Sequence, residues 1–76
     1  MPQASDAQRA RMIERFGSVG DAGPIDFLEG RGYELTGAWE WIAPRPDFTV
    51  DEVECIEFLV DEWDYGYVAA IREVQP

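Results

Sequence analysis

The sequence predicts a small, single-domain α+β protein in which two N-terminal helices precede a small antiparallel sheet, with an acidic amphipathic helix packed on that sheet. Three observations predict this class: two capping-box motifs that begin helices, a stretch of alternating apolar and polar residues, and a length of 76 residues, which allows one modest core. We expect residues 1–76 to form one domain with frayed ends at 1–4 and 75–76.

Both N-terminal helices have recognisable start and stop signals. Ser5 begins a capping-box motif, so a first helix is expected from Asp6 to Phe16. A second, shorter helix begins near Pro24, which suits a first turn, and ends at Gly30 or Gly32. The first helix forms the only basic segment of the chain, through Arg9, Arg11 and Arg15.

The sheet is predicted from a change of period. From Tyr33 to Ile42 large apolar residues alternate with polar ones, as in a half-buried strand. Gly37 interrupts this pattern, so the segment is either one strand with a bulge or a hairpin that turns at Thr36-Gly37. A final strand at Tyr67–Val74 is expected to pair with it, antiparallel.

The third helix has the strongest start signal. Thr49 and Glu52 form a capping box, Phe48 is placed to pack against Val53, and the helix should run from Val50 to Asp64. At about 100° per residue its core face comprises Val50, Val53, Ile56, Leu59, Val60 and Trp63. All three tryptophans, including Trp41, are expected in the core, and the predicted core list is Phe16, Phe27, Leu28, Leu35, Trp39, Val53, Ile56, Leu59, Val60, Trp63, Val68 and Ile71.

The same helix carries an unusual number of carboxylates. Between Asp47 and Asp64 there are many acids and no basic residue, although like charges three or four residues apart destabilise a helix and acids at its C-terminal end oppose its dipole. A functional reason is therefore expected. The predicted partner-binding residues are the acids and the tyrosines that follow them: Asp51, Glu54, Glu57, Asp61, Glu62, Asp64, Tyr65 and Tyr67.

Composition argues against catalysis and against direct binding of polyanions. The chain has no histidine and no lysine, its acids lack the spacing of an oxygen cage, and Cys55 lies among acids that would raise its pKa, so it is interpreted as an inert boundary residue. We expect no enzyme activity, no cofactor and no metal site. A net charge of −10 disfavours nucleic acid and anionic membranes as ligands, and no apolar run has the length of a signal peptide or membrane span.

Two motifs rich in tryptophan stand out in the sequence. The chain reads T-x-x-W-x-W-x-x-P from Thr36 to Pro44, and F-L-x-x-E-W-D-[FY]-G matches Phe58 to Gly66. Together they resemble a pattern found in a set of small phage-encoded proteins. The resemblance covers under half of the chain and implies a phage origin, with no activity or site attached. In size, acidity and lack of catalytic residues the chain is also similar to anti-CRISPR and other anti-defence proteins, which implies inhibition by stoichiometric binding.

The hypothesis is therefore a non-enzymatic acidic inhibitor that acts in the cytoplasm of a bacterial host cell. It would mimic DNA by charge, bind a basic nucleic-acid-binding protein such as a CRISPR effector subunit or a restriction enzyme, and compete with DNA. The alternative is a phage or bacterial adaptor, or a homo-oligomer, that interacts through aromatic residues while its acidity reflects solubility or salt adaptation. The sequence leaves the oligomeric state open.

Overall fold

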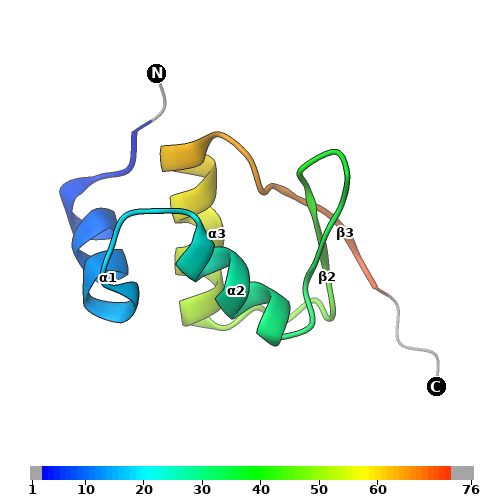
Figure 1. Cartoon of the computed structure of the whole chain (residues 1–76). Coiled ribbons are helices and arrows are strands. Elements are labelled where there is room, and N and C mark those ends of the chain that lie inside the picture. The colour runs from blue at the N-terminus through cyan, green and yellow to red at the C-terminus, as the bar shows by residue number, and fades with distance from the viewer. Residues whose placement is uncertain (1–2, 73–76) are drawn as a thin grey trace.

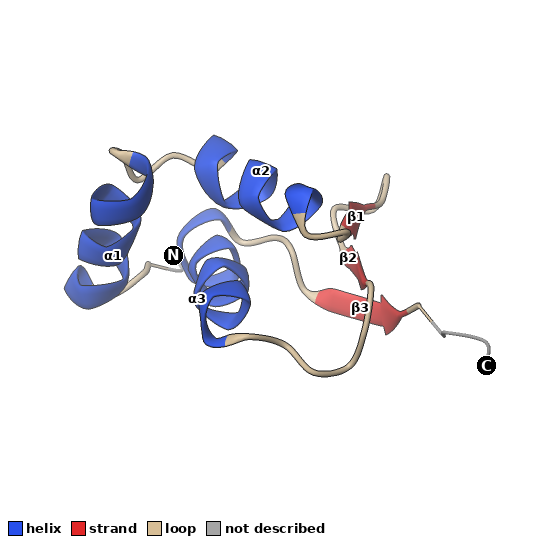
Figure 2. Cartoon of the chain, turned by 90° about the horizontal axis from the view of Figure 1, so that it is seen from below, coloured by secondary structure: helices blue, strands red, loops and turns tan. Residues whose placement is uncertain are grey.

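The computed structural model describes residues 3–72 and confirms the α+β class. The helices gather at one end of an elongated molecule, with the sheet at the other end (Figures 1 and 2). The elements are α1 (Asp6–Phe16), α2 (Ala22–Gly30), β1 (Glu34–Leu35), β2 (Trp41–Ala43), α3 (Val50–Phe58), the π-helical segment η1 (Leu59–Trp63) and β3 (Val68–Ile71). No helix among these is long and apolar enough to cross a membrane.

Both capping boxes are present, which confirms the predicted starts of α1 and α3. Ser5 Oγ accepts a hydrogen bond from the Gln8 N–H at 3.1 Å, and Thr49 Oγ1 accepts one from the Glu52 N–H at 3.2 Å. Of the ends expected to fray, residues 1, 2, 75 and 76 lie outside the described part, but Ala4 is buried. Its N–H donates to Glu62 Oε1 at 3.1 Å, which ties the start of the chain to η1.

The segment around Gly37 forms a hairpin and not a bulged strand. β1 and β2 are antiparallel, with Glu34 opposite Ile42, and Thr36 closes the turn because its Oγ1 accepts hydrogen bonds from the N–H groups of Ala38 and Glu40. Trp39 then adopts a left-handed conformation with φ 62°. This turn breaks the alternation that the sequence suggested.

The predicted antiparallel pairing of the last strand is wrong, because β3 runs parallel to β2 in a mixed sheet of order β1-β2-β3. Parallel neighbours need a long crossover, and α3 with η1 provides it between them. The pairing skips Ala69, so β3 carries an irregularity beside Trp41. Residues 73 and 74 of the predicted strand lie outside the described residues.

The core face of α3 is rotated from the predicted one. The fully buried positions on α3 and η1 are Glu52, Cys55, Phe58 and Leu59, whereas Val50 is 74% exposed. Val53, Ile56 and Val60 are only half-buried. The line of buried residues on this helix is thus shifted by one residue, or about 100° around the helix axis, from the predicted line. The reason is that the helix packs against α1, α2 and buried residues of β2.

Three further members of the predicted core are exposed: Trp39 at 58%, Trp63 at 42% and Ile71 at 42%. Trp39 is turned out by its left-handed backbone, Trp63 ends the π-helical turn, and Ile71 lies on an edge strand. Trp41 and Leu28 are fully buried as expected. The predicted residues Phe16, Phe27, Leu35 and Val68 are half-buried and pack around the core.

A buried carboxylate joins the helical part of the molecule to the part that contains the sheet. Glu52 is 0% exposed, yet its oxygens accept hydrogen bonds from Tyr33 Oη at 2.9 Å and Arg45 Nη2 at 2.6 Å, and Arg31 Nη1 lies 3.6 Å away. It also accepts from the Thr49 N–H at 3.0 Å. One side chain therefore links the end of α2, the start of β1, the loop after β2 and the start of α3.

Glu52→Gln should destabilise the fold by about 3 kcal/mol near neutral pH, because it breaks a buried charge pair. The hydrogen bond from Arg45 is the largest cause that lowers the pKa of Glu52 from 4.5 to about 2, and the bonds from Thr49 and Tyr33 add to it. A lowered native pKa adds stability that is complete above the unfolded value and is lost as the pH falls from about 4.5 to about 2. Urea unfolding across this pH range should show the loss of stability in the wild type and in an exposed control, Glu29→Gln, and a smaller loss in Glu52→Gln. Curves of unfolding free energy against pH that run parallel for the three proteins would contradict the assignment.

Gly66→Ala should destabilise the protein by more than about 1 kcal/mol, because Gly66 has φ +94° and an added Cβ would lie 3.1 Å from Trp41 Nε1. Gly30→Ala is the matched control, since no atom lies within 4 Å of its Cβ position and its φ is ordinary. That change should be neutral or stabilise by less than about 1 kcal/mol. Thermal melting of both variants tests the contrast, and equal melting temperatures would refute it.

Candidate functional site

The acidic stripe predicted on the third helix faces the basic side of α1. Arg15 Nη2 lies 2.7 Å from Asp51 Oδ1 and 2.5 Å from Glu54 Oε1, and Arg11 Nη1 lies 2.5 Å from Glu54 Oε2. Although no basic residue lies near them in the sequence, Asp51 and Glu54 are therefore paired with arginines of α1. Their charge holds α1 against α3, which the order of the residues along the chain did not reveal.

The C-terminal part of the stripe is also partly engaged. Arg9 Nη2 lies 2.9 Å from Glu62 Oε1, and Gln8 Nε2 donates to Asp61 Oδ2 at 2.8 Å. The N–H of Ala4 and the Arg9 guanidinium lower the pKa of Glu62. Only Glu57 and Asp64, both exposed, have no hydrogen bond or ion pair from their side chains within residues 3–72.

Every arginine of the chain takes part in an internal ion pair. The sequence has six arginines and no lysine, and each arginine has a carboxylate within 3.6 Å. Within the described part, the carboxylates without an arginine partner are Asp6, Glu14, Asp21, Asp26, Glu29, Glu40, Glu57, Asp61 and Asp64. The free charge of the described surface is therefore negative.

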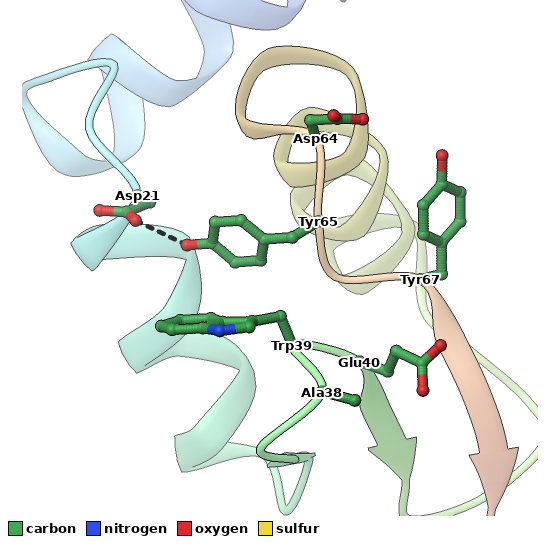
Figure 3. A pocket seen from close by; sticks show the side chains of 7 residues that line it. All are labelled: Asp21, Ala38, Trp39, Glu40, Asp64, Tyr65 and Tyr67. Carbon is green, nitrogen blue, oxygen red and sulfur yellow. Dashed lines mark hydrogen bonds between the residues drawn. The ribbon is translucent and has the colours of Figure 1, made fainter.

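A pocket of about 460 Å³ lies where the hairpin tip meets the end of η1, and it opens widely to solvent. Asp21, Ala38, Trp39, Glu40, Asp64, Tyr65 and Tyr67 line it (Figure 3). Backbone hydrogen bonds join its two walls: the Gly66 N–H donates to the Trp39 carbonyl at 2.9 Å, and the Trp41 N–H donates to the Tyr67 carbonyl at 2.8 Å. The pocket is thus part of a hydrogen-bonded contact between the hairpin and the crossover.

One wall of the pocket is fixed by aromatic packing. The rings of Trp39 and Tyr65 meet edge to face with centroids 5.3 Å apart, and Tyr65 Oη donates to Asp21 Oδ2 at 2.6 Å (Figure 3). Burial and this bond raise the pKa of Tyr65. Asp21 lies at the start of α2, so the contact ties three separate segments together.

The remaining groups of the pocket are free to meet a ligand. Trp39 is 58% and Tyr67 57% exposed, and the carboxylates of Glu40 and Asp64 form no hydrogen bond or ion pair with the described residues. In Figure 3 Tyr67 stands on the opposite side of Tyr65 from Asp21. Trp39 and Asp64, with φ 62° and 63°, are the non-glycine residues with positive φ in the described part of the chain. Such strain is common at binding sites.

The structure brings together some predicted site residues and adds others. Asp64, Tyr65 and Tyr67 line the pocket, whereas Asp51, Glu54, Glu57, Asp61 and Glu62 lie along α3 and η1 away from it. Asp21, Trp39 and Glu40 were missed, because the alternation assigned Trp39 to the core and nothing in the sequence linked Asp21 to Tyr65. The turn signal at Thr36-Gly37 was the one clue to an exposed Trp39.

Cys55, predicted at a boundary, is instead fully buried. Burial raises the pKa of its thiol to about 11, so the thiol is protonated at neutral pH. Among residues 3–72 no three metal-ligating side chains of His, Cys, Asp or Glu gather into a group that could hold an ion.

Comparison with known proteins identifies the lineage. Residues 1–74 match the family described as "Phage Pam3 gp59 related protein". The chain belongs to this family. This finding supports the phage origin that the sequence motifs implied. No curated protein and no solved structure matches the chain.

Arg15→Gln should lower the free energy of unfolding by about 1 kcal/mol, because this side chain is only 26% exposed and holds two carboxylates of α3. The matched control Arg72→Gln removes a more exposed pair with Glu34 and should cost less than about 0.5 kcal/mol. In about 1 M salt, where charges are screened beyond about 3 Å, the Arg15 difference should shrink. Urea unfolding at low and high salt measures both; a difference that grows with salt would contradict the ion-pair role.

Proposed function

We propose that this phage protein is a non-enzymatic inhibitor, similar in action to anti-CRISPR proteins, that binds a basic DNA-binding surface of a bacterial defence complex and competes with DNA. One observation carries the proposal: all six arginines are used in internal ion pairs, while many carboxylates have no arginine partner. The described surface can therefore offer a partner negative charge without nearby free cations, which complements a surface that binds phosphates.

Internal pairing divides the acids into two groups. Asp51 and Glu54 hold α1 in place, so a partner would compete with arginines for them. Glu57, Asp61 and Asp64 have no arginine partner and are the acids of the stripe that we propose to contact the defence protein. The stripe spans about 20 Å along α3 and η1, enough to replace a short run of phosphates in a groove.

A second candidate is an adaptor that binds through aromatic contacts. The exposed faces of Trp39 and Tyr67 favour it, since large aromatic residues are enriched at the centres of protein interfaces. Salt separates the two functions. Affinity through the acids should fall as ionic strength rises, whereas affinity through aromatic burial should change little.

A double variant, Glu57→Gln with Asp61→Asn, removes two negative charges from the stripe. It should weaken binding to the partner by about tenfold and leave the fold intact. The side-chain amide introduced by Asp61→Asn would still offer an oxygen to Gln8. The control pair Glu14→Gln and Asp26→Asn removes the same charge from exposed positions on α1 and α2 and should bind normally. The measurement is competition with a DNA duplex for purified DNA-binding subunits of CRISPR and restriction complexes, preceded by capture from nuclease-treated host lysate.

The proposal expects the wild type to displace DNA, with an affinity that falls steeply with salt. An affinity that changes neither with salt concentration nor in the Glu57→Gln/Asp61→Asn variant would contradict the charge mechanism and favour the adaptor. Failure to displace DNA from any of these complexes would overturn the inhibitor function itself.

A further inference from the structure

We propose that the pocket between the hairpin tip and the end of η1 receives the guanidinium group of an arginine side chain from the partner protein. The inference rests on the proposed function, because it names how a basic partner would be anchored. Its test uses peptides and does not require the partner.

The charge of the pocket selects a cation. Three carboxylates line it and no arginine does. Asp21 is engaged by Tyr65, but Glu40 and Asp64 have no partner among residues 3–72. Asp64 also caps the C-terminal end of η1, where the helix dipole adds partial negative charge. An incoming cation would thus meet two free carboxylates and a helix terminus.

The walls of the pocket select a flat cation with apolar faces. Trp39 and Tyr67 leave more than half of their surface exposed, so their rings are accessible to a ligand. A guanidinium stacks on an aromatic face and can still bond carboxylates in its plane, whereas an ammonium is more strongly hydrated. The chain itself contains this arrangement: Arg31 Cζ lies 4.6 Å from the Phe27 ring centroid while Arg31 Nη1 lies 3.6 Å from Glu52.

The pocket is held ready for this ligand by its backbone. A tryptophan in the left-handed region is unusual, and here it keeps the ring at the surface beside Tyr65. Its carbonyl is fixed by the Gly66 N–H at 2.9 Å. A preformed aromatic wall reduces the entropy lost on binding.

The test is a titration of the full chain with a capped Gly-Arg-Gly tripeptide, followed by NMR of the three indole N–H resonances. The Trp39 resonance should shift in a saturable way, whereas a Gly-citrulline-Gly peptide of the same shape but no charge should cause no saturable shift. A Gly-Lys-Gly peptide should bind at least threefold more weakly. Equal binding of the citrulline peptide, equal binding of the lysine peptide, or no saturable shift at Trp39 would each overturn the proposal.

Two variants locate the site. Trp39→Asn removes the ring at a position where asparagine tolerates positive φ, and Asp64→Asn removes one charge under the same backbone constraint. Each should weaken tripeptide binding at least fivefold. Because Trp39→Asn lacks the reporting indole, binding to it is followed at the backbone N–H resonance of Glu40 in the same pocket. Asp64→Asn keeps the test decisive if Trp39→Asn fails to fold. Trp63→Phe, an exposed tryptophan outside the pocket, is the control and should bind normally.

The outcomes separate this inference from the proposed function. Glu57→Gln with Asp61→Asn should leave tripeptide binding unchanged while weakening the defence partner. If the tripeptide fails to bind and DNA is still displaced, the pocket assignment falls and the inhibitor stands. If the tripeptide binds at Trp39 and no DNA is displaced from any complex, the pocket stands and the inhibitor falls.

Discussion

The fold depends on one buried carboxylate. Taking the charge of Glu52 out of water costs several kcal/mol, and the cost is offset only because Arg45, Tyr33 and the Thr49 N–H all bond to it. These partners come from segments that precede and follow β2, so the bonds form together only when the hairpin, the loop and α3 are in their native positions. The same group begins α3 by capping it. Glu52 therefore fixes both where the crossover helix starts and how its first turn is tied to the loop after β2 and to the start of β1.

The direction of that helix sets the place of the pocket. With the start of α3 fixed at Glu52 beside the origin of β1, the end of η1 lies near the tip of the hairpin, and β3 must then return parallel to β2. The chain from Asp64 to Tyr67 is bonded to the hairpin tip as it enters β3. A three-residue strand and a two-residue strand would form a weak sheet alone, so the hairpin needs β3 and packing from the rest of the chain to be stable.

Local sequence signals were enough to predict where the helices begin. The features that the sequence could not predict depend on contacts between residues far apart in the chain. Capping boxes act over three residues, and both gave correct helix starts. The strand direction, the rotation of α3 and the burial of Glu52 depend on partners far along the chain, such as Tyr33 and Arg15. The charge stripe shows the same limit: its acids were predicted as site residues by their spacing, but their pairing with α1 requires two helices to meet. Of the pocket residues, Asp64, Tyr65 and Tyr67 were predicted. Trp39 was wrongly assigned to the core by the alternation, because its left-handed conformation in the turn reverses the direction of its side chain.

The two acidic surfaces differ in what they can contribute to binding. Acids on an exposed stripe are hydrated and screened, so they speed association and tune salt dependence more than they add affinity. A pocket with aromatic walls can remove water from a bound group, and charges there act at a lower local dielectric. The positive φ of Trp39 costs on the order of 1–3 kcal/mol at an exposed position. The positive φ of Asp64 is the usual left-handed conformation of a helix C-cap. Trp39 lies at the pocket, and because a protein this small has little stability to spare, its strained backbone supports the proposed binding role of this surface.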